Sequence, residues 1–482
     1  MKYLVMALMS GAASLAVSGA QAADLPSRKS EPANYVKICD AYGAGFYTIP
    51  GTDTCLRVGG YVRVEWQYTP GNAIWTVSAA GVPALAQVSG ALDSSGSEVR
   101  GRVDLDARTP TALGTVRTSI RLRSANTSGI RNAPIANNAV ITNASASATG
   151  ITIEQAMVQW AGFTFGVAPE NYAFMPSIFY TGNNWAGFPN GMKQLAYTAT
   201  FGGGFSATLA LEDRTDFGYA AATYRHSPLT GYHLVGNIRV DQSWGWAVLH
   251  AMVGNQSLRS DFATAAAIVP GVLQGIPAST GNATPLIGST TKMGFAIGAT
   301  VKINLPMIAA GDAIWFTANY ADGLLGGLAS NGGLSQAANA SGRRFLGGIQ
   351  RNDTGLVVTS GNCTVLAPCT VGSTKGWNVG MALTHYWTPQ WRSNFKTSYM
   401  QLTPPTVAAT AASPFQWGRG TNWEVAGSII YSPAQNFDIG LELQYMQNRL
   451  NVQNPSVAFQ AAGSPGLRNS GWSSHLRIER QF

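Results

Sequence analysis

The 482-residue sequence is poor in charge, since Lys, Arg, Asp and Glu make up 11% of it, against roughly 25% in a soluble globular protein. It also lacks a membrane helix after the N-terminus, because such a helix needs about 20 apolar residues and Pro270, Pro277 and Pro285 interrupt the uncharged stretch 262–291. The first absence argues against a soluble domain, and the second excludes a helical-bundle membrane protein. Membrane-like composition without membrane helices favours a closed barrel, in which alternation spreads the apolar residues along each strand.

Cysteine and histidine are scarce as well. The four cysteines allow three pairings into two disulfides, and the sequence leaves the choice open. The pairs nearest in sequence are Cys39–Cys55 and Cys363–Cys369. None of the spacings is CxxC, which argues against a zinc site. The five histidines lie outside metal and nucleophile motifs, so we expect no catalytic site, metal or cofactor. His250 and His385 are predicted on the outer face, near the membrane interface.

The N-terminus predicts export. Lys2 gives a basic start, residues 3–17 an apolar stretch, and Ala20-Gln21-Ala22 a small-residue cleavage site. A membrane anchor is the alternative, but the stretch is short and rich in Ala and Gly. The predicted organisation is a signal peptide at 1–22, an N-terminal periplasmic-side segment at 23–53 and a transmembrane β-barrel at 54–482.

From Cys55 onward the recurring pattern has period 2 and is bounded by Gly, Pro, Asn and Asp clusters. In the first run Val58 and Val62 face one way, and Arg57, Arg63 and Glu65 the other. A soluble sandwich could also carry a charged face. The connections between the strands distinguish a barrel from a sandwich, because long loops alternate with tight turns, as in an up-and-down outer-membrane barrel. Sixteen strands are predicted near 54–68, 98–108, 115–125, 150–159, 164–168, 193–201, 205–214, 232–241, 246–256, 292–304, 313–322, 375–387, 391–402, 421–431, 437–450 and 473–482.

Aromatic residues support the same fold class, which is all-β with sixteen antiparallel transmembrane strands. Several lie near strand ends on the predicted outer face, where an aromatic girdle would meet the lipid interface. They are Trp66, Trp377, Trp387, Trp391, Trp423, Tyr431 and Tyr445.

The segment Tyr35–Arg63, YVKICDAYGAGFYTIPGTDTCLRVGGYVR, closely resembles the start of alphaproteobacterial porins. Asp106-Ala-Arg-Thr, the stretch Leu195–Phe201 and the final Phe482 also resemble that family, so the resemblance runs from end to end. It implies a homotrimer of 16-stranded barrels in the outer membrane of a Gram-negative bacterium, with the third loop folded into the lumen. Such porins often have several acids in that loop, whereas 169–192 has Glu170 alone, which argues against a strongly charged constriction.

A basic ladder is predicted along the inner wall, because a hydrated solute needs a polar lining. Its pore-lining members are Arg57, Arg63, Arg100, Arg102, Arg108, Arg117, Arg121, Arg123, Arg392, Lys396 and Arg477. Interspersed acids, such as Glu65 and Asp106, would neutralise part of it. One interpretation is a mild preference for anions; the other is that the cations pair with acids and hold the wall rigid. The two are compatible.

The third loop is predicted to narrow the channel with bulky neutral groups, and the alternative is that these pack the loop against the wall. The constriction candidates are Glu170, Tyr172, Phe174, Phe179, Tyr180 and Trp185. A final aromatic on an alternating strand resembles the signal read by the barrel-assembly machinery, which makes Phe482 a candidate assembly signal. An ordinary closing strand, with Phe482 contacting lipid, is the other interpretation.

The sequence therefore predicts a porin, a passive water-filled channel for small hydrophilic solutes and ions, embedded in outer-membrane lipid. A pI near 9.3 could suggest nucleic acid, but export and an inward-facing basic wall argue against that partner. Two alternatives stay open. One is a substrate-selective anion channel, and the other is a plugged surface adhesin acting through its long loops, of which 323–374 is the longest.

Overall fold

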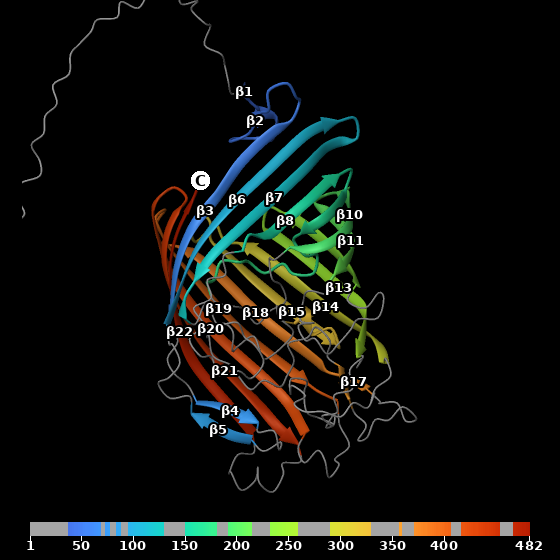
Figure 1. The fold of residues 1–482 in the computed structure, drawn as a ribbon, viewed down its shortest axis with the longest axis vertical. Helices are drawn as coiled ribbons and strands as arrows, with labels where there is room; N and C mark the ends of the chain where they lie inside the picture. The colour runs from blue at the N-terminus through green and yellow to red at the C-terminus, as the bar shows by residue number, and fades with distance from the viewer. Residues whose placement is uncertain are drawn as a thin grey trace, which may run out of the picture.

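The structure is a computed structural model that describes residues 37–68, 73–77, 83–87, 95–129, 150–180, 191–214, 232–258, 290–328, 356–358, 371–405, 416–453 and 466–482. Its main element is a closed barrel of sixteen antiparallel strands (Figure 1), which confirms the predicted fold class. The strands are β3 (Cys55–Tyr68), β6 (Ser95–Thr111), β7 (Gly114–Thr127), β8 (Thr152–Trp160), β9 (Phe163–Ala168), β10 (Met192–Gly202), β11 (Phe205–Asp213), β12 (Tyr232–Gln242), β13 (Gly245–Leu258), β14 (Thr290–Asn304), β15 (Ala313–Asp322), β18 (Lys375–Tyr386), β19 (Trp391–Thr403), β20 (Gln416–Ala434), β21 (Phe437–Gln453) and β22 (Gly466–Gln481).

Each barrel strand pairs with the next along the chain, and the last pairs with the first. In that closing pair Arg480 of β22 lies opposite Val62 of β3, and Gln481 lies opposite Tyr61. Closure leaves no sheet edge, so the strands satisfy their backbone hydrogen-bonding groups among themselves, as a lipid environment requires. Among the described residues, no helix is long and apolar enough to cross a membrane.

Alternation sorts the side chains between the two faces of the wall. Along β3, Val58, Val62 and Trp66 are 46%, 52% and 47% exposed on the outside. Glu65 and Gln67, the residues on either side of Trp66, are buried on the inside. Aromatic rings also pair across neighbouring strands, as Trp391 and Tyr431 do with ring centroids 4.6 Å apart. An apolar outer face is what a lipid-embedded barrel needs.

Several short elements accompany the barrel. Figure 1 places the N-terminal hairpin of β1 (Lys37–Ile38) and β2 (Tyr47–Thr48) at the same end as the C-terminus. The short hairpin of β4 (Ala73–Val77) and β5 (Pro83–Gln87) lies at the opposite end. Another short pair joins β16 (Leu356–Val358) to β17 (Val371–Ser373), and two 3-10 turns are η1 (Asp40–Tyr42) and η3 (Leu325–Gly327).

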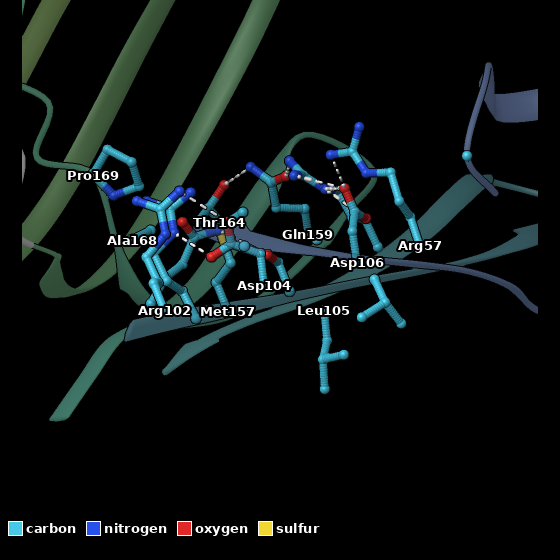
Figure 2. A pocket seen from close by; sticks show the side chains of 18 of the residues that line it. Arg57, Arg102, Asp104, Leu105, Asp106, Met157, Gln159, Thr164, Ala168 and Pro169 are labelled. Carbon is cyan, nitrogen blue, oxygen red and sulfur yellow. Dashed lines mark hydrogen bonds and ion pairs between the residues drawn. The ribbon is translucent and has the colours of Figure 1, made fainter. Parts of the chain in front are cut away.

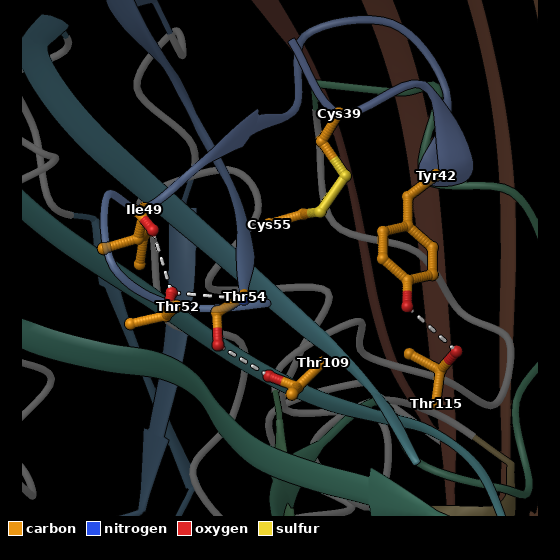
Figure 3. Close-up of a disulfide and its surroundings, with 8 residues drawn as sticks. All are labelled: Cys39, Tyr42, Ile49, Thr52, Thr54, Cys55, Thr109 and Thr115. Carbon is orange, nitrogen blue, oxygen red and sulfur yellow. Dashed lines mark hydrogen bonds between the residues drawn. A yellow bond between two sulfur atoms is a disulfide. The ribbon is translucent and has the colours of Figure 1, made fainter. Parts of the chain in front are cut away.

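A disulfide joins Cys39 to Cys55 and ties the N-terminal hairpin to the first residue of β3 (Figure 3). The predicted Cys39–Cys55 pair is thereby confirmed, whereas Cys363 and Cys369 lie outside the described residues. Two hydrogen bonds add to the attachment. Tyr42 Oη lies 3.3 Å from Thr115 Oγ1 of β7, as Figure 3 shows, and Thr54 Oγ1 lies 2.8 Å from the Thr109 hydroxyl of β6.

Replacing both Cys39 and Cys55 by serine should release this hairpin and leave the barrel folded. The bond closes a loop with a sequence separation of 16, for which chain entropy predicts about 3 kcal/mol of local stabilisation. Limited proteolysis followed by mass spectrometry should show faster cleavage before residue 55, with heat-modifiable migration on gels retained. The pair of substitutions Cys363→Ser and Cys369→Ser is the matched control. Equal cleavage rates in the two variants would contradict the prediction.

Candidate functional site

The third loop begins at a buried ion cluster on the inner wall. Arg214 Nη2, just beyond β11, lies 2.7 Å from Glu170 Oε2 of the loop and 3.0 Å from Glu212 Oε2. The three side chains are 2%, 6% and 0% exposed. Asn171 continues the attachment, because its backbone N–H donates to Glu212 Oε1 at 2.7 Å and its carbonyl accepts from Asn237 Nδ2 at 3.0 Å. Arg214 therefore holds Glu170 at the wall.

Aromatic residues of the loop then pack against β13. The Tyr172 ring meets the His250 ring edge-on, with centroids 4.5 Å apart, and Phe174 lies 5.5 Å from the same histidine. His250 is 2% exposed, and its Nε2 lies 3.3 Å from Thr300 Oγ1. The prediction that His250 faces outward was wrong, because Leu249, its neighbour, is the exposed residue. His385 lies at the end of β18, where its Nδ1 is 2.6 Å from Asp312 Oδ2.

The described part of the loop ends on the far side of the barrel. The Ile178 carbonyl accepts a hydrogen bond from Asn394 of β19, and Phe179 packs on Ala382 of β18. Tyr180 reaches β21 and β22: its backbone N–H donates to Glu442 Oε2 at 2.9 Å, and the Arg477 guanidinium lies 3.9 Å from its ring centroid.

Burial raises the pKa of the Tyr180 phenol well above its usual range, so this side chain stays neutral at physiological pH.

The third loop crosses from β9 to β21 inside the barrel, which confirms its predicted position in the lumen. Its described aromatic side chains lie against the wall, and Trp185 lies outside the described residues.

All eleven basic residues predicted on the inner wall form ion pairs within 4 Å. Eight come from β3, β6 and β7, which are consecutive strands of the barrel. The pairs on or near these strands are Arg57, Arg108 and Arg117 with Asp106, Arg102 and Arg121 with Asp104, Arg63 with Glu479, Arg100 with Glu98, and Arg123 with Glu154. The wall is therefore a network of ion pairs.

Asp106 is the centre of the densest part of this network. Arg108 and Arg117 lie directly opposite each other in the β6–β7 register, an arrangement of like charges that is destabilising by itself. Each donates to the Asp106 carboxylate through Nε and Nη2 at 3.0–3.2 Å. Arg57 Nη2 is farther, at 3.7 Å, and this side chain is 50% exposed. One carboxylate thus serves three guanidinium groups.

A cavity of about 830 Å³ lies between this cluster and the base of the third loop. Its lining includes Arg57, Arg102, Asp104 and Asp106 on one side and Pro169 of the loop on the other. Figure 2 shows the charged side chains on the cavity side of the sheet, whereas Leu105 points to the opposite side. The arrangement provides a wide polar space that charged solutes can approach.

The other three predicted wall residues lie around the far end of the third loop. Lys396 is fully buried, with Nζ 3.9 Å from Glu424 Oε2 and 5.1 Å from the Phe179 ring centroid. Arg477 pairs with Glu65 beneath Tyr180. Arg392 Nη2 lies 2.6 Å from Asp438 Oδ2. These cations help to hold the loop and its neighbouring strands.

Sequence reasoning missed several members of this arrangement. Arg214 and Glu212 were not selected, although both occupy inward positions at the end of a predicted strand. Glu154, Asp438 and Glu424 were also missed, because an ion pair between strands depends on their register. Within the described part of the chain, no group of three or more His, Cys, Asp or Glu residues is placed to hold a metal ion.

Comparison with known proteins agrees with this geometry. A family described as a porin subfamily matches residues 24–465. The chain belongs to this porin subfamily. Porin Omp2b of Brucella canis is 34% identical over 252 residues, which cover 49% of this chain and 62% of the relative. Porin Omp2b of Brucella abortus strain 2308 matches with the same identity and coverage. These matches confirm the predicted resemblance to alphaproteobacterial porins.

A solved structure supports the fold of this porin. The outer membrane channel DcaP of Acinetobacter baumannii is 14% identical, with a TM-score of 0.56, and the match covers 90% of this chain and 99% of DcaP. This porin spans 62% of the length of the Brucella relatives that it matches. The family and fold place it in the outer membrane of a Gram-negative bacterium.

Proposed function

We propose that this porin is a passive, water-filled diffusion channel for small hydrophilic solutes and ions, and that it is a channel rather than an enzyme. The observation that carries the proposal is the polar cavity between the ion-paired wall of β3, β6 and β7 and the base of the third loop. The outside of the same strands is apolar, as Val58 and Val103 illustrate. A polar interior inside an apolar shell is the arrangement that lets hydrated solutes cross a bilayer.

The wall carries more positive than negative charge, which supports a mild preference for anions. The eleven basic residues share eight acids, so an excess of three positive charges remains within these pairs. Two of these charges lie at Asp106 and one at Asp104. A low-dielectric tube focuses their field on the lumen, and salt screens it over roughly 10 Å at 0.1 M.

Current through the purified porin in a planar bilayer tests the channel, and a salt gradient gives its ion preference. We expect open channels whose reversal potential shows a mild anion preference. A cation preference would be consistent with the channel proposal but would refute the assignment of the wall as its selectivity element. Well-folded protein that carries no current would refute the channel and favour a function of the long loops.

We also propose that the porin is a homotrimer, because one side of the barrel is too short to face lipid. Strand β9 has six residues, whereas a transmembrane strand needs about 9–11. Aromatic residues crowd the outer face there: the Phe163 ring centroid lies 5.7 Å from Phe165 and 4.8 Å from Tyr197. Contact with a second copy would cover the outer face of the barrel beside the short strand β9. Current steps in groups of three, together with a trimer mass in detergent, are the expected results; single steps from a monomer would exclude the trimer.

Export and assembly complete the proposal: a signal peptide at 1–22, a periplasmic-side segment at 23–53 and a barrel at 54–482 inserted into lipid by the barrel-assembly machinery. Phe482 supports the last step, since its backbone exchanges two hydrogen bonds of 3.1 Å with Gly60 of β3. Its ring is 67% exposed and lies beside Gly60, where a larger residue would meet it. Phe482 thus helps to close the barrel through its backbone, while its ring stays exposed.

Phe482→Ser should sharply lower the amount of folded porin in the outer membrane of cells. The physical reason is that the exposed ring, and not the closing backbone bonds, is what the assembly machinery would read. Heat-modifiable migration of membrane fractions measures the folded amount, and Phe482→Tyr is the matched control that keeps a ring. Normal assembly of the serine variant would reduce Phe482 to an ordinary lipid contact. Refolding the same variant in detergent separates recognition from stability.

A further inference from the structure

The inner wall has an apolar area where a water-filled channel calls for polar side chains. It lies on β13, β14, β15 and β19, near the ends that lead into the long loops. Met252, Ala296, Ala321, Met400 and Leu402 face the inside there, and each is 2% exposed or less. Something other than water must cover these residues.

The start of the sixth loop lies against this area, where Gly327 approaches Met252 and Ala296. After β15 the chain turns inward at Gly323, whose φ of +87° lies in the region that glycine adopts without strain. The 3-10 turn η3 follows, and Leu324, Leu325 and Leu328 are fully buried. We call residues 323–328 the inner latch.

Hydrogen bonds hold the two ends of the inner latch on Thr374, which lies between β17 and β18, and on Asn378 of β18. The Gly323 backbone N–H donates to the Thr374 carbonyl at 2.9 Å. At the other end, the Asn378 side-chain amide donates to the Leu328 carbonyl. Asn378 is itself buried and accepts from Asn319 Nδ2 at 2.8 Å, so the bond is part of an ordered network on the wall.

The inner latch also touches the third loop. A methyl group at Gly327 would overlap the Ala296 side chain and lie 2.8 Å from Met252 Cε and 3.1 Å from Tyr172 Oη. Glycine is therefore required for this close approach. Tyr172 in turn packs on His250, so the latch, the third loop and β13 form one packed unit.

We propose that the inner latch is a second loop folded into the lumen, which positions the third loop and closes this side of the channel. Solutes are thereby confined to the arginine-lined side, where the cavity lies. The fully buried Leu324, Leu325 and Leu328 then anchor the segment that limits pore width together with the third loop. This inference rests on the proposed channel function and goes beyond it, because it assigns the pore boundary to the sixth loop.

The test replaces Leu324, Leu325 and Leu328 by serine together and compares single-channel conductance with that of the parent protein. We expect conductance to rise on the order of twofold, because three serines in this apolar contact release the inner latch and a wider lumen carries more ions. Larger neutral sugars should also enter liposomes faster. Leu113→Ser is the matched control, since Leu113 lies in a tight turn and is 66% exposed. A triple variant that folds and conducts like the parent would overturn the proposal.

A labelling measurement is independent of current and of the triple variant's folding. Leu325→Cys in the full-length porin should react slowly with a membrane-impermeant maleimide, whereas Leu113→Cys should react fast, both measured above the unsubstituted protein. Fast reaction at position 325 would overturn the inner latch. Failure of the channel proposal looks different, because the parent itself would then carry no current while position 325 stayed protected.

Discussion

Replacing Arg57, Arg117 and Arg121 by glutamine together should abolish the anion preference of this porin. These three side chains are the excess cations of the wall: without them Asp106 keeps Arg108 and Asp104 keeps Arg102, each in a one-to-one pair. All three side chains are between 32% and 50% exposed, so their charges act on solutes in the cavity. The reversal potential in a KCl gradient should move toward zero.

Salt concentration provides a second check on the same variant. The screening length is about 30 Å at 0.01 M and about 3 Å at 1 M, so the difference from the parent should be large in dilute salt and vanish in concentrated salt. Arg480→Gln is the control, because this exposed residue occupies an outward position opposite Val62 and its substitution removes one positive charge outside the lumen. An unchanged reversal potential in dilute salt would show that the wall acts through rigidity alone.

The strands were predictable because most of them alternate strictly. In β3 every second position from Val58 to Trp66 is apolar or glycine, and the positions between them carry Arg63, Glu65 and other polar or small groups. A wall between lipid and water demands that pattern at each residue, so the sequence carries it. All sixteen predicted strands are confirmed, with ends displaced by up to seven residues, as at the start of β22.

The inward position of His250 could not be predicted from alternation. Strand β13 has apolar residues on both faces, with Val248 and Met252 inside and Leu249 outside. Its inner face is apolar because the third loop and the inner latch cover it. Alternation therefore disappears where the lumen is filled by protein, and the loss of the signal is itself a mark of that filling.

The cations of the site were predictable, but only some of their partners were, such as Glu65 and Asp106. Alternation places Arg117 and Arg121 on the inner face of a single strand. Whether a given polar partner lies opposite depends on register, as with Gln159 of β8, which accepts from Arg117 Nη1 at 3.0 Å. The path of the third loop was equally hidden, because its attachment uses Arg214, whose two acid partners lie 44 and 2 residues away in sequence.

Arg214→Met should release the base of the third loop and raise both conductance and its fluctuations. The substitution leaves Glu170 and Glu212 buried together without the guanidinium that now contacts both at 2.7 and 3.0 Å. Removing one partner from a buried ion cluster costs about 3–5 kcal/mol, and displacing the loop is the simplest way to rehydrate Glu170. Single-channel recording should show a higher mean conductance with frequent transitions, and thermal unfolding should begin earlier.

Adding Glu170→Gln and Glu212→Gln to Arg214→Met should restore the behaviour of the parent. The glutamines remove the two buried charges, and a side-chain carbonyl at position 212 can still accept the Asn171 backbone N–H. A buried cluster replaced as a whole is tolerated far better than one that has lost a single member, so rescue would assign the effect to unpaired charge. If Arg214→Met alone conducts and melts like the parent, the cluster does not hold the loop, and the contacts of Tyr172 and Tyr180 must suffice.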